Sequence, residues 1–215
     1  MSSPSFTEQL RDAAGDQWNR VINHKFTIEL ANGSINKEVL KKYLIQDHRF
    51  LDAFVILLAS TIAKCRCLED RIQGCQFLGL ITGKENTYFE RSFEVLGCSN
   101  IEERMKIPNE TVTTEFVQLM KSTAKEGTLG EMLSVLVVAE WSYLSWGEKV
   151  LDKTNRGVDF TTWEWVGELC FVYYLMIAHM HALSQLNSDF QYTYSRPSFR
   201  RLLHIRCCLL ERFAR

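Results

Sequence analysis

The sequence predicts an all-α protein, a single-domain bundle of up-and-down helices. Apolar residues recur at three- and four-residue steps through most of the chain, the period of a helix with one buried face, and strand-like alternation is almost absent. Only three prolines interrupt 215 residues, which leaves room for long helices. With 46% hydrophobic and 24% charged residues, the composition is that of a globular domain with a sizeable core.

The N-terminal segment is expected to begin with a helix. Ser5–Glu8 reads S-F-T-E, a capping box, and it is followed by an apolar face made of Phe6, Leu10, Ala14, Trp18 and Ile22. A short helix with the sequence KFTIEL should come next. It should end at the turn signal Asn32-Gly33.

A long helix is expected from about Asn36 to Lys64. Its apolar stripe consists of Leu40, Tyr43, Leu44, Phe50, Leu51, Phe54 and Leu58, and Asp47 falls on the same stripe. A carboxylate among aromatic side chains is costly to bury unless something hydrogen-bonds it, so Asp47 is a candidate ligand-binding residue. The adjacent His48 and Arg49 are expected to face away from this stripe, into solvent.

Two further helices are expected near Leu68–Thr82 and Glu85–Leu96, separated by Gly83, and Gly97 should end the second. The next helix should run through Met120.

Two residues could cap this helix, Asn109 or Thr111. Thr128 then opens a helix with the sequence TLGEMLSVLVVAEWSYLSWGEKVLD, which is apolar almost all round in its middle. Such a helix belongs at the centre of a bundle.

The central helix repeats the anomaly of the long one. Glu140 lies on a stripe formed by Leu133, Leu136, Val137, Tyr143, Leu144 and Gly147. Two helices therefore each place one acid on an apolar face, with Phe50 near Asp47 and Tyr143 near Glu140. Two such acids could grip a small nitrogenous heteroaromatic, or could divide general-acid and general-base work. Each could also be a structural acid bonded to an arginine or to a helix N-terminus.

The segment FTIELANGSINKEVLKKYLIQDHRFLDAFVILLA resembles the TenA family, the thiaminase II-like aminopyrimidine hydrolases. The resemblance rests on the ANGSI turn, a tyrosine, QD and an aromatic pair. It continues through GTLGEMLSVLVVAEWSYLSWGE to EWV and covers about residues 5–166. It implies a haem oxygenase-like helical bundle, a homo-oligomer, and a small-molecule pyrimidine substrate.

The resemblance also implies roles for individual residues. The family's ring-binding aspartate falls on Asp47, and a tyrosine of the site is kept as Tyr143. Two further tyrosines of the family fall on Phe50 and Phe116, so these four residues are the expected substrate contacts. Phe50, Phe116 and Tyr143 would form stacking walls, while Asp47 would hold the amidine edge of the ring by two hydrogen bonds.

The family's nucleophilic cysteine falls on Ala139, so its covalent mechanism is not expected here. The pattern AEWSYLSW is similar to a branch without the catalytic cysteine, common in plants and fungi and named for a glutamate, and we expect a fungal member. That branch is associated with hydrolysis of amino- and formylamino-pyrimidine breakdown products. The resemblance implies that Glu140 activates water at the exocyclic carbon. The rival interpretation is a non-catalytic relative that binds a ligand or a partner.

The C-terminal part departs from the family. Residues 1–167 are expected to form the TenA-like bundle, and residues 168–215 a divergent segment of the same domain. Leu169–Leu183 is an apolar run of fifteen residues, short of the roughly 20 of a membrane span, so a buried helix is expected there rather than a membrane anchor. Glu211 is a faint match to the family's C-terminal catalytic glutamate.

Other features exclude several classes of function. A net charge of −1 gives no overall nucleic-acid signal, although the last twenty residues hold six arginines and one glutamate, which could meet an anionic partner. No metal-ligand spacing or phosphate-loop motif is present, so no metal or cofactor is expected. The seven scattered cysteines are expected to be free thiols, and the absence of an export signal favours a cytoplasmic protein.

Overall fold

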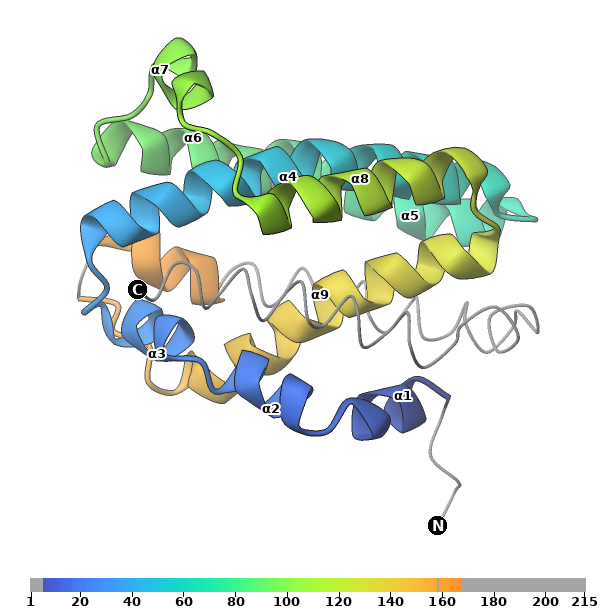
Figure 1. Cartoon of the computed structure of the whole chain (residues 1–215), viewed down its shortest axis with the longest axis horizontal. Helices are drawn as coiled ribbons and strands as arrows, with labels where there is room; N and C mark the ends of the chain where they lie inside the picture. Colours follow the sequence, from blue (N-terminus) through green and yellow to red (C-terminus); the bar gives the residue numbers. More distant parts are fainter. Residues whose placement is uncertain (1–5, 158, 168–215) are drawn as a thin grey trace.

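The computed structural model describes residues 6–157 and 159–167. Within these ranges every regular element is a helix, which confirms the all-α fold class (Figure 1). The expectations for Ser5, for the segment 168–215 and for Glu211 lie outside the described residues. No helix in the described part is long and apolar enough to cross a membrane.

The N-terminal helices are α1 (Phe6–Ala14), α2 (Asp16–Ile22) and α3 (Lys25–Asn32). The expected face from Phe6 to Ile22 is therefore divided between two helices. The division falls at Gly15, whose φ of 48° lies in the left-handed region that glycine tolerates best. Helix α3 ends as predicted, because Gly33 adopts the left-handed conformation with φ 75°.

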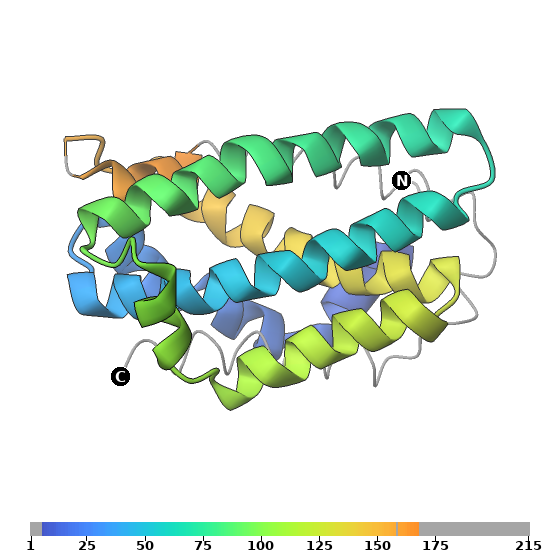
Figure 2. The ribbon, with the colours of Figure 1, turned by 90° about the horizontal axis from the view of Figure 1, so that it is seen from above.

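Helix α4 (Lys37–Lys64) is the long helix that the sequence predicts, and Asn36 caps it by accepting hydrogen bonds from the backbone N–H groups of Glu38 and Val39. It contacts α5 (Leu68–Leu80), α8 (Thr111–Glu126) and α9 (Leu129–Leu151). Figure 2 shows α4 running between α8 and a long, continuous helical rod that begins with α5. The stripe that carries Asp47 is buried along its whole length.

The rod consists of α5 (Leu68–Leu80), a π-helical turn η1 (Ile81–Glu85) and α6 (Asn86–Val95). The expected break at Gly83 is wrong, since the helix widens there and continues. The expected end at Gly97 is correct, because this glycine has a φ of 65°.

The π turn changes which face of the rod is buried. Phe77 and Phe89 are both buried, yet twelve residues of ideal α-helix would place them about 120° apart. One extra residue in a wide turn removes roughly 100° of that difference and returns both rings to one face. The hydroxyls of Thr82 and Thr87 bond to the carbonyls of Leu78 and Gly83, four residues earlier, at 2.8 Å each.

The second half of the bundle contains α7 (Ile101–Lys106), which the sequence did not predict, and α8 (Thr111–Glu126). Helix α8 continues beyond the expected Met120. Neither candidate cap is used, because the N-cap residue is Glu110 and its side chain makes no capping bond.

Helix α9 (Leu129–Leu151) lies between the α4 layer and the helices α1 to α3, the central place that its composition predicts (Figure 1). Thr128 and Glu131 form a complete capping box at its start. A last described helix covers residues 160–167.

This last helix packs against α6 through stacking, hydrogen-bonding and ionic contacts. Trp165 stacks on Tyr88 with ring centroids 5.0 Å apart, the Tyr88 hydroxyl donates to the backbone carbonyl of Thr161 at 2.5 Å, and Arg91 pairs with Glu164.

Candidate active site

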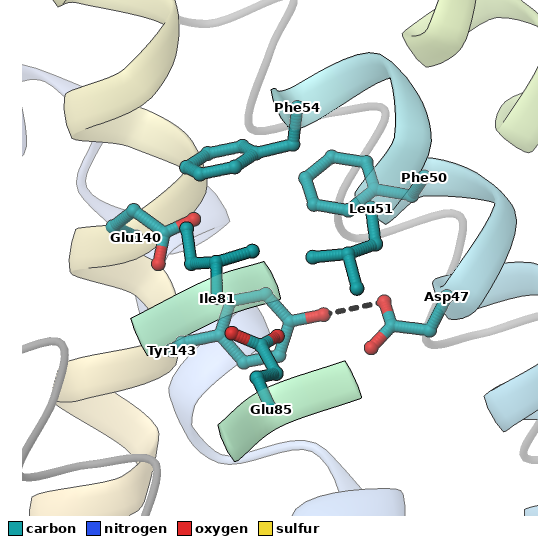
Figure 3. A pocket seen from close by; sticks show the side chains of 8 residues that line it. All are labelled: Asp47, Phe50, Leu51, Phe54, Ile81, Glu85, Glu140 and Tyr143. Atoms are coloured by element: carbon teal, nitrogen blue, oxygen red, sulfur yellow. Dashed lines mark hydrogen bonds between the residues drawn. The ribbon is translucent and has the colours of Figure 1, made fainter. Parts of the chain in front are cut away.

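A buried pocket lies where α4, η1 and α9 meet (Figure 3). It contains about 250 Å³ of space between the lining atoms, part of it open to solvent. Its lining side chains are Asp47, Phe50, Leu51, Phe54, Ile81, Glu85, Glu140 and Tyr143.

Asp47 accepts the last hydrogen bond of a short series that begins with two tyrosine hydroxyl groups. Its side chain comes from α4, and the Tyr143 hydroxyl on α9 donates to its Oδ1 at 2.6 Å. The Tyr43 hydroxyl lies 3.0 Å from that of Tyr143. Because Tyr143 has a single hydroxyl hydrogen and gives it to Asp47, Tyr43 is the donor in the second bond. The carboxylate that the sequence marks as costly to bury is thus stabilised by an oriented relay.

Glu140 lies on α9 one turn before Tyr143 and is 2% exposed. Its carboxyl group reaches the pocket from the α9 side, while Asp47 reaches it from α4 (Figure 3). The structure therefore brings the two acids singled out in the sequence into one cavity. Ala139, the residue before Glu140, is fully buried.

Of the phenylalanines expected at the site, Phe50 lines the pocket and Phe116 lies behind it. Phe50 lines the pocket directly and stacks on Phe116, with ring centroids 4.8 Å apart and an interplanar angle of 27°. Phe116 comes from α8, is fully buried and is absent from the pocket lining. It supports the wall that Phe50 presents and does not face the pocket itself.

Glu85 is a third acid of the pocket, and the sequence reasoning missed it. It is 4% exposed and points into the pocket from η1 (Figure 3). The signal was present, since Phe77, Ile81, Glu85 and Tyr88 follow one another at steps of four, four and three residues, as on the Asp47 stripe. Treating Gly83 as a helix break concealed it.

Arg49 is not solvated as expected. Its guanidinium donates to the backbone carbonyls of Arg104 and Ile107 at 2.6 and 2.7 Å, and to the side-chain oxygen of Asn109 at 2.8 Å. These hydrogen bonds hold the connection between α7 and α8 against α4.

Gln46, the residue before Asp47, also fixes the connection between α7 and α8. Its side-chain amide donates to the carbonyl of Pro108 at 3.0 Å and accepts from the backbone N–H of Glu110 at 3.1 Å. Because α8 begins directly after Glu110, this clamp sets where α8 starts relative to α4, and hence where Phe116 meets Phe50.

His48 is also partly buried. Its Nε2 lies 3.1 Å from Oδ1 of Asn86, and its ring packs against Phe89 and Phe93 at centroid distances of 5.1 and 5.4 Å. Burial lowers the pKa of His48, and the charge of Arg104 acts in the same direction, against the opposing hydrogen bond to Asn86. The imidazole is therefore kept neutral to lower pH than a solvated one.

The described cysteines lie away from the pocket. Cys65, Cys67, Cys75 and Cys98 are free thiols, and none of them lines the cavity. Burial raises the pKa of Cys65 and Cys98, which disfavours their thiolates. Among the residues the structure describes, no cluster of three or more His, Cys, Asp or Glu is arranged to hold a metal ion.

Comparison with known proteins identifies relatives of this chain. The model of the TENA/THI-4/PQQC family matches residues 11–169. The aminopyrimidine aminohydrolase of Halalkalibacterium halodurans is 25% identical over 146 residues, which are 68% of this chain and 65% of that protein. The protein of the same name from Bacillus subtilis is 24% identical over 146 residues, 68% of this chain and 61% of that protein. The matches thus span less than two thirds of the length of these relatives.

Solved structures share the fold. A TenA homologue from P. horikoshii OT3 superposes with a TM-score of 0.83 at 20% identity, covering 96% of this chain and 97% of that one. A TenA homologue from Pyrococcus furiosus gives a TM-score of 0.80 at 21% identity, covering 96% and 98%. At these identities the likeness concerns the fold, and it agrees with the haem oxygenase-like bundle that the sequence predicts.

Proposed function

Because the chain belongs to the TENA/THI-4/PQQC family, we propose that it hydrolyses breakdown products of the thiamine pyrimidine. The substrate would be an aminomethyl- or formylaminomethyl-pyrimidine and the product the hydroxymethyl-pyrimidine. Two relatives that carry the name aminopyrimidine aminohydrolase support this substrate class. The observation that carries the proposal is the meeting of Asp47 and Glu140 in one small aromatic pocket.

Asp47 is proposed to bind the amino-bearing edge of the ring. A carboxylate accepts hydrogen bonds through two oxygens, and an aminopyrimidine presents an amino group beside a ring nitrogen that can carry a proton. The hydrogen bond from Tyr143 restrains the rotation of the Asp47 carboxylate and so preorganises it for a planar ligand. The Phe50 ring, supported from behind by Phe116, would stack on the pyrimidine.

Glu140 is proposed to activate water. It would take a proton from a water molecule that attacks the exocyclic carbon while the carbon–nitrogen bond breaks. From the protonated aminomethyl-pyrimidine the nitrogen would leave as ammonia and accept that proton from Glu140, and from the formylaminomethyl-pyrimidine it would leave with the proton as formamide. Since Ala139 replaces the family's nucleophile, no covalent enzyme intermediate forms. Under this proposal the chain would belong to the branch without the catalytic cysteine, and its source would be a fungus.

Further parts of the proposal rest on the family resemblance. Residues 168–215 would complete the same domain as residues 1–167, with Glu211 as a third catalytic acid, and the protein would work as a homo-oligomer in the cytoplasm. Light scattering on the purified protein tests the oligomer, since a monomeric mass would contradict it.

The proposed function is tested by turnover. The purified protein is incubated with thiamine, the aminomethyl-pyrimidine and its N-formyl derivative, and products are followed by mass spectrometry. The matched variants are Asp47→Asn and Glu140→Gln, with Glu148→Gln on the exposed side of α9 as the control. We expect hydroxymethyl-pyrimidine from wild type and the control, and at least a 100-fold lower rate from the two pocket variants. A folded wild-type protein that releases no product would favour the non-catalytic alternative.

A further inference from the structure

The pocket contains an acid that neither the sequence pattern nor the family resemblance assigned. Glu85 is 4% exposed, and it shares the cavity with Asp47, Glu140 and Tyr143. It is the last residue of η1, so its position depends on the wide turn in the α5–α6 rod. Turns of this kind inside α-helices are frequent at functional sites.

Packing on both sides fixes the backbone that carries Glu85. Before the turn, Phe77 packs edge-on against Phe54 with ring centroids 6.2 Å apart. After the turn, Tyr88 stacks on Trp165, and Phe89 contacts the ring of His48. Since these contacts join the rod to α4 and to the helix 160–167, Glu85 is presented by a rigid element.

The polar side chains described in the pocket lining are three carboxyl groups and one hydroxyl group. Asp47, Glu85 and Glu140 offer carboxyl groups, and the Tyr143 hydroxyl gives its hydrogen to Asp47. The other lining side chains are apolar, and none of those described is lysine, arginine, histidine or an amide. An ionised carboxyl group only accepts hydrogen bonds, so a ligand held by the ionised forms of these described acids must itself supply donors. A carbonyl or phosphate oxygen would face carboxyl groups instead of donors.

We infer that Glu85 binds the exocyclic amine of the substrate and makes the pocket selective for a pyrimidine with a primary amine over the N-formyl amide. The inference rests on the proposed function for its ligand class, and it assigns a specificity-determining residue to that site. A primary alkylamine is protonated near neutral pH, and an ammonium donates a charge-assisted hydrogen bond to a carboxylate that an amide cannot match.

The test compares Glu85→Gln with wild type on two ligands, the aminomethyl-pyrimidine and its N-formyl derivative. Glutamine keeps the size and one acceptor of glutamate and removes the charge. Glu94→Gln, the same change on the exposed side of α6, is the matched control. Initial rates give kcat/KM where the ligand is turned over, and calorimetry gives Kd where it is not.

For the amine, we expect Glu85→Gln to lower kcat/KM or affinity by roughly 10- to 100-fold, the range of a hydrogen bond to a charged group. For the N-formyl derivative the change should stay within threefold, and Glu94→Gln should alter neither ligand. Equal losses for both ligands, or no loss for either, would overturn the role of Glu85.

Wild type provides a second test that needs no variant. It should favour the amine over the N-formyl derivative by at least tenfold, and a preference under threefold would overturn the inference even if Glu85→Gln does not fold. Failure of the proposed function would give a different experimental result. In that case wild type shows no turnover, while amine-selective binding and its loss in Glu85→Gln still report on Glu85.

Discussion

The hydroxyl of Tyr143 on α9 donates a 2.6 Å hydrogen bond to Asp47 on α4, a residue 96 positions earlier in the chain. This bond joins the two helices that carry the acids of the pocket. Tyr43, one turn before Asp47, adds the second hydroxyl of the relay.

Tyr143→Phe should destabilise the protein more than Tyr43→Phe. The first change removes a donor from a buried carboxylate, at a cost of about 1–3 kcal/mol, whereas the second removes a bond between neutral hydroxyls, at about 0.5–1.5 kcal/mol. Urea unfolding followed by circular dichroism measures both. A Tyr143→Phe protein as stable as wild type would mean that the bond to Asp47 contributes little to folding.

Phe50→Leu and Phe116→Leu should separate ligand binding from stability. Both should cost about 1–3 kcal/mol of folding free energy, the common range for substitution of a buried residue. Only Phe50 lines the pocket. Loss of its stacking, worth about 0.5–1.5 kcal/mol, should therefore weaken binding of the hydroxymethyl-pyrimidine about three- to tenfold, against twofold or less for Phe116→Leu. Calorimetric titration checks this, and the reverse order would contradict the layered arrangement.

Acidification should destabilise the protein through His48. Because burial lowers the pKa of His48 in the folded state, the unfolded chain binds more protons between that pKa and the unperturbed value of about 6.5. The stability that the neutral ring contributes is complete above about pH 6.5 and is lost as the pH falls toward the folded-state pKa, by at most about 1.4 kcal/mol per pH unit.

The control is His48→Gln, which retains an amide near Asn86 and cannot titrate. The difference in unfolding free energy between wild type and this variant should be larger at pH 7.5 than at pH 5.5. An unchanged or inverted difference would show that His48 does not titrate as its surroundings suggest.

Arg49→Lys should loosen the connection between α7 and α8. One ammonium cannot reproduce a guanidinium that serves three acceptors in fixed directions, so we expect a loss of about 1–3 kcal/mol. Hydrogen exchange should also become faster over residues 104–110. Arg66→Lys, at an exposed position after α4, is the control. Exchange in that segment at the wild-type rate would show that Arg49 is dispensable for its order.

Periodicity was sufficient to predict the fold and part of the pocket. Asp47 and Glu140 could be recognised because each interrupts a long apolar stripe on a helix without internal breaks. The same reasoning failed at Glu85, because the turn that carries it contains Gly83, and glycine is usually treated as a helix breaker. A π turn arises from the packing of the rings on either side, which a local pattern does not reveal.

The roles of Gln46 and Arg49 could not be predicted from the sequence either. Both are polar residues next to Asp47, and helical spacing places Arg49 off the buried face. Their partners are four backbone groups and the side-chain oxygen of Asn109, all 55 to 64 residues away in sequence, in a connection that has no periodic signal. Long side chains that bind distant carbonyls can be assigned only when the connection has been located.

The π turn also affects how this chain should be aligned with its relatives. A five-residue turn in an otherwise α-helical rod is what a one-residue insertion leaves behind when the helices on both sides keep their packing. A relative with a regular helix here would have one residue fewer between Gly79 and Asn86, and an ungapped alignment would then shift α6 by one position. Counterparts of Glu85 should therefore be sought with a single-residue gap allowed in this segment. Deletion of Gly83 should convert the wide turn to regular α-helix and leave the aromatic face of α6 against the core, because Phe77 and Phe89 would then lie about 20° apart around an ideal helix.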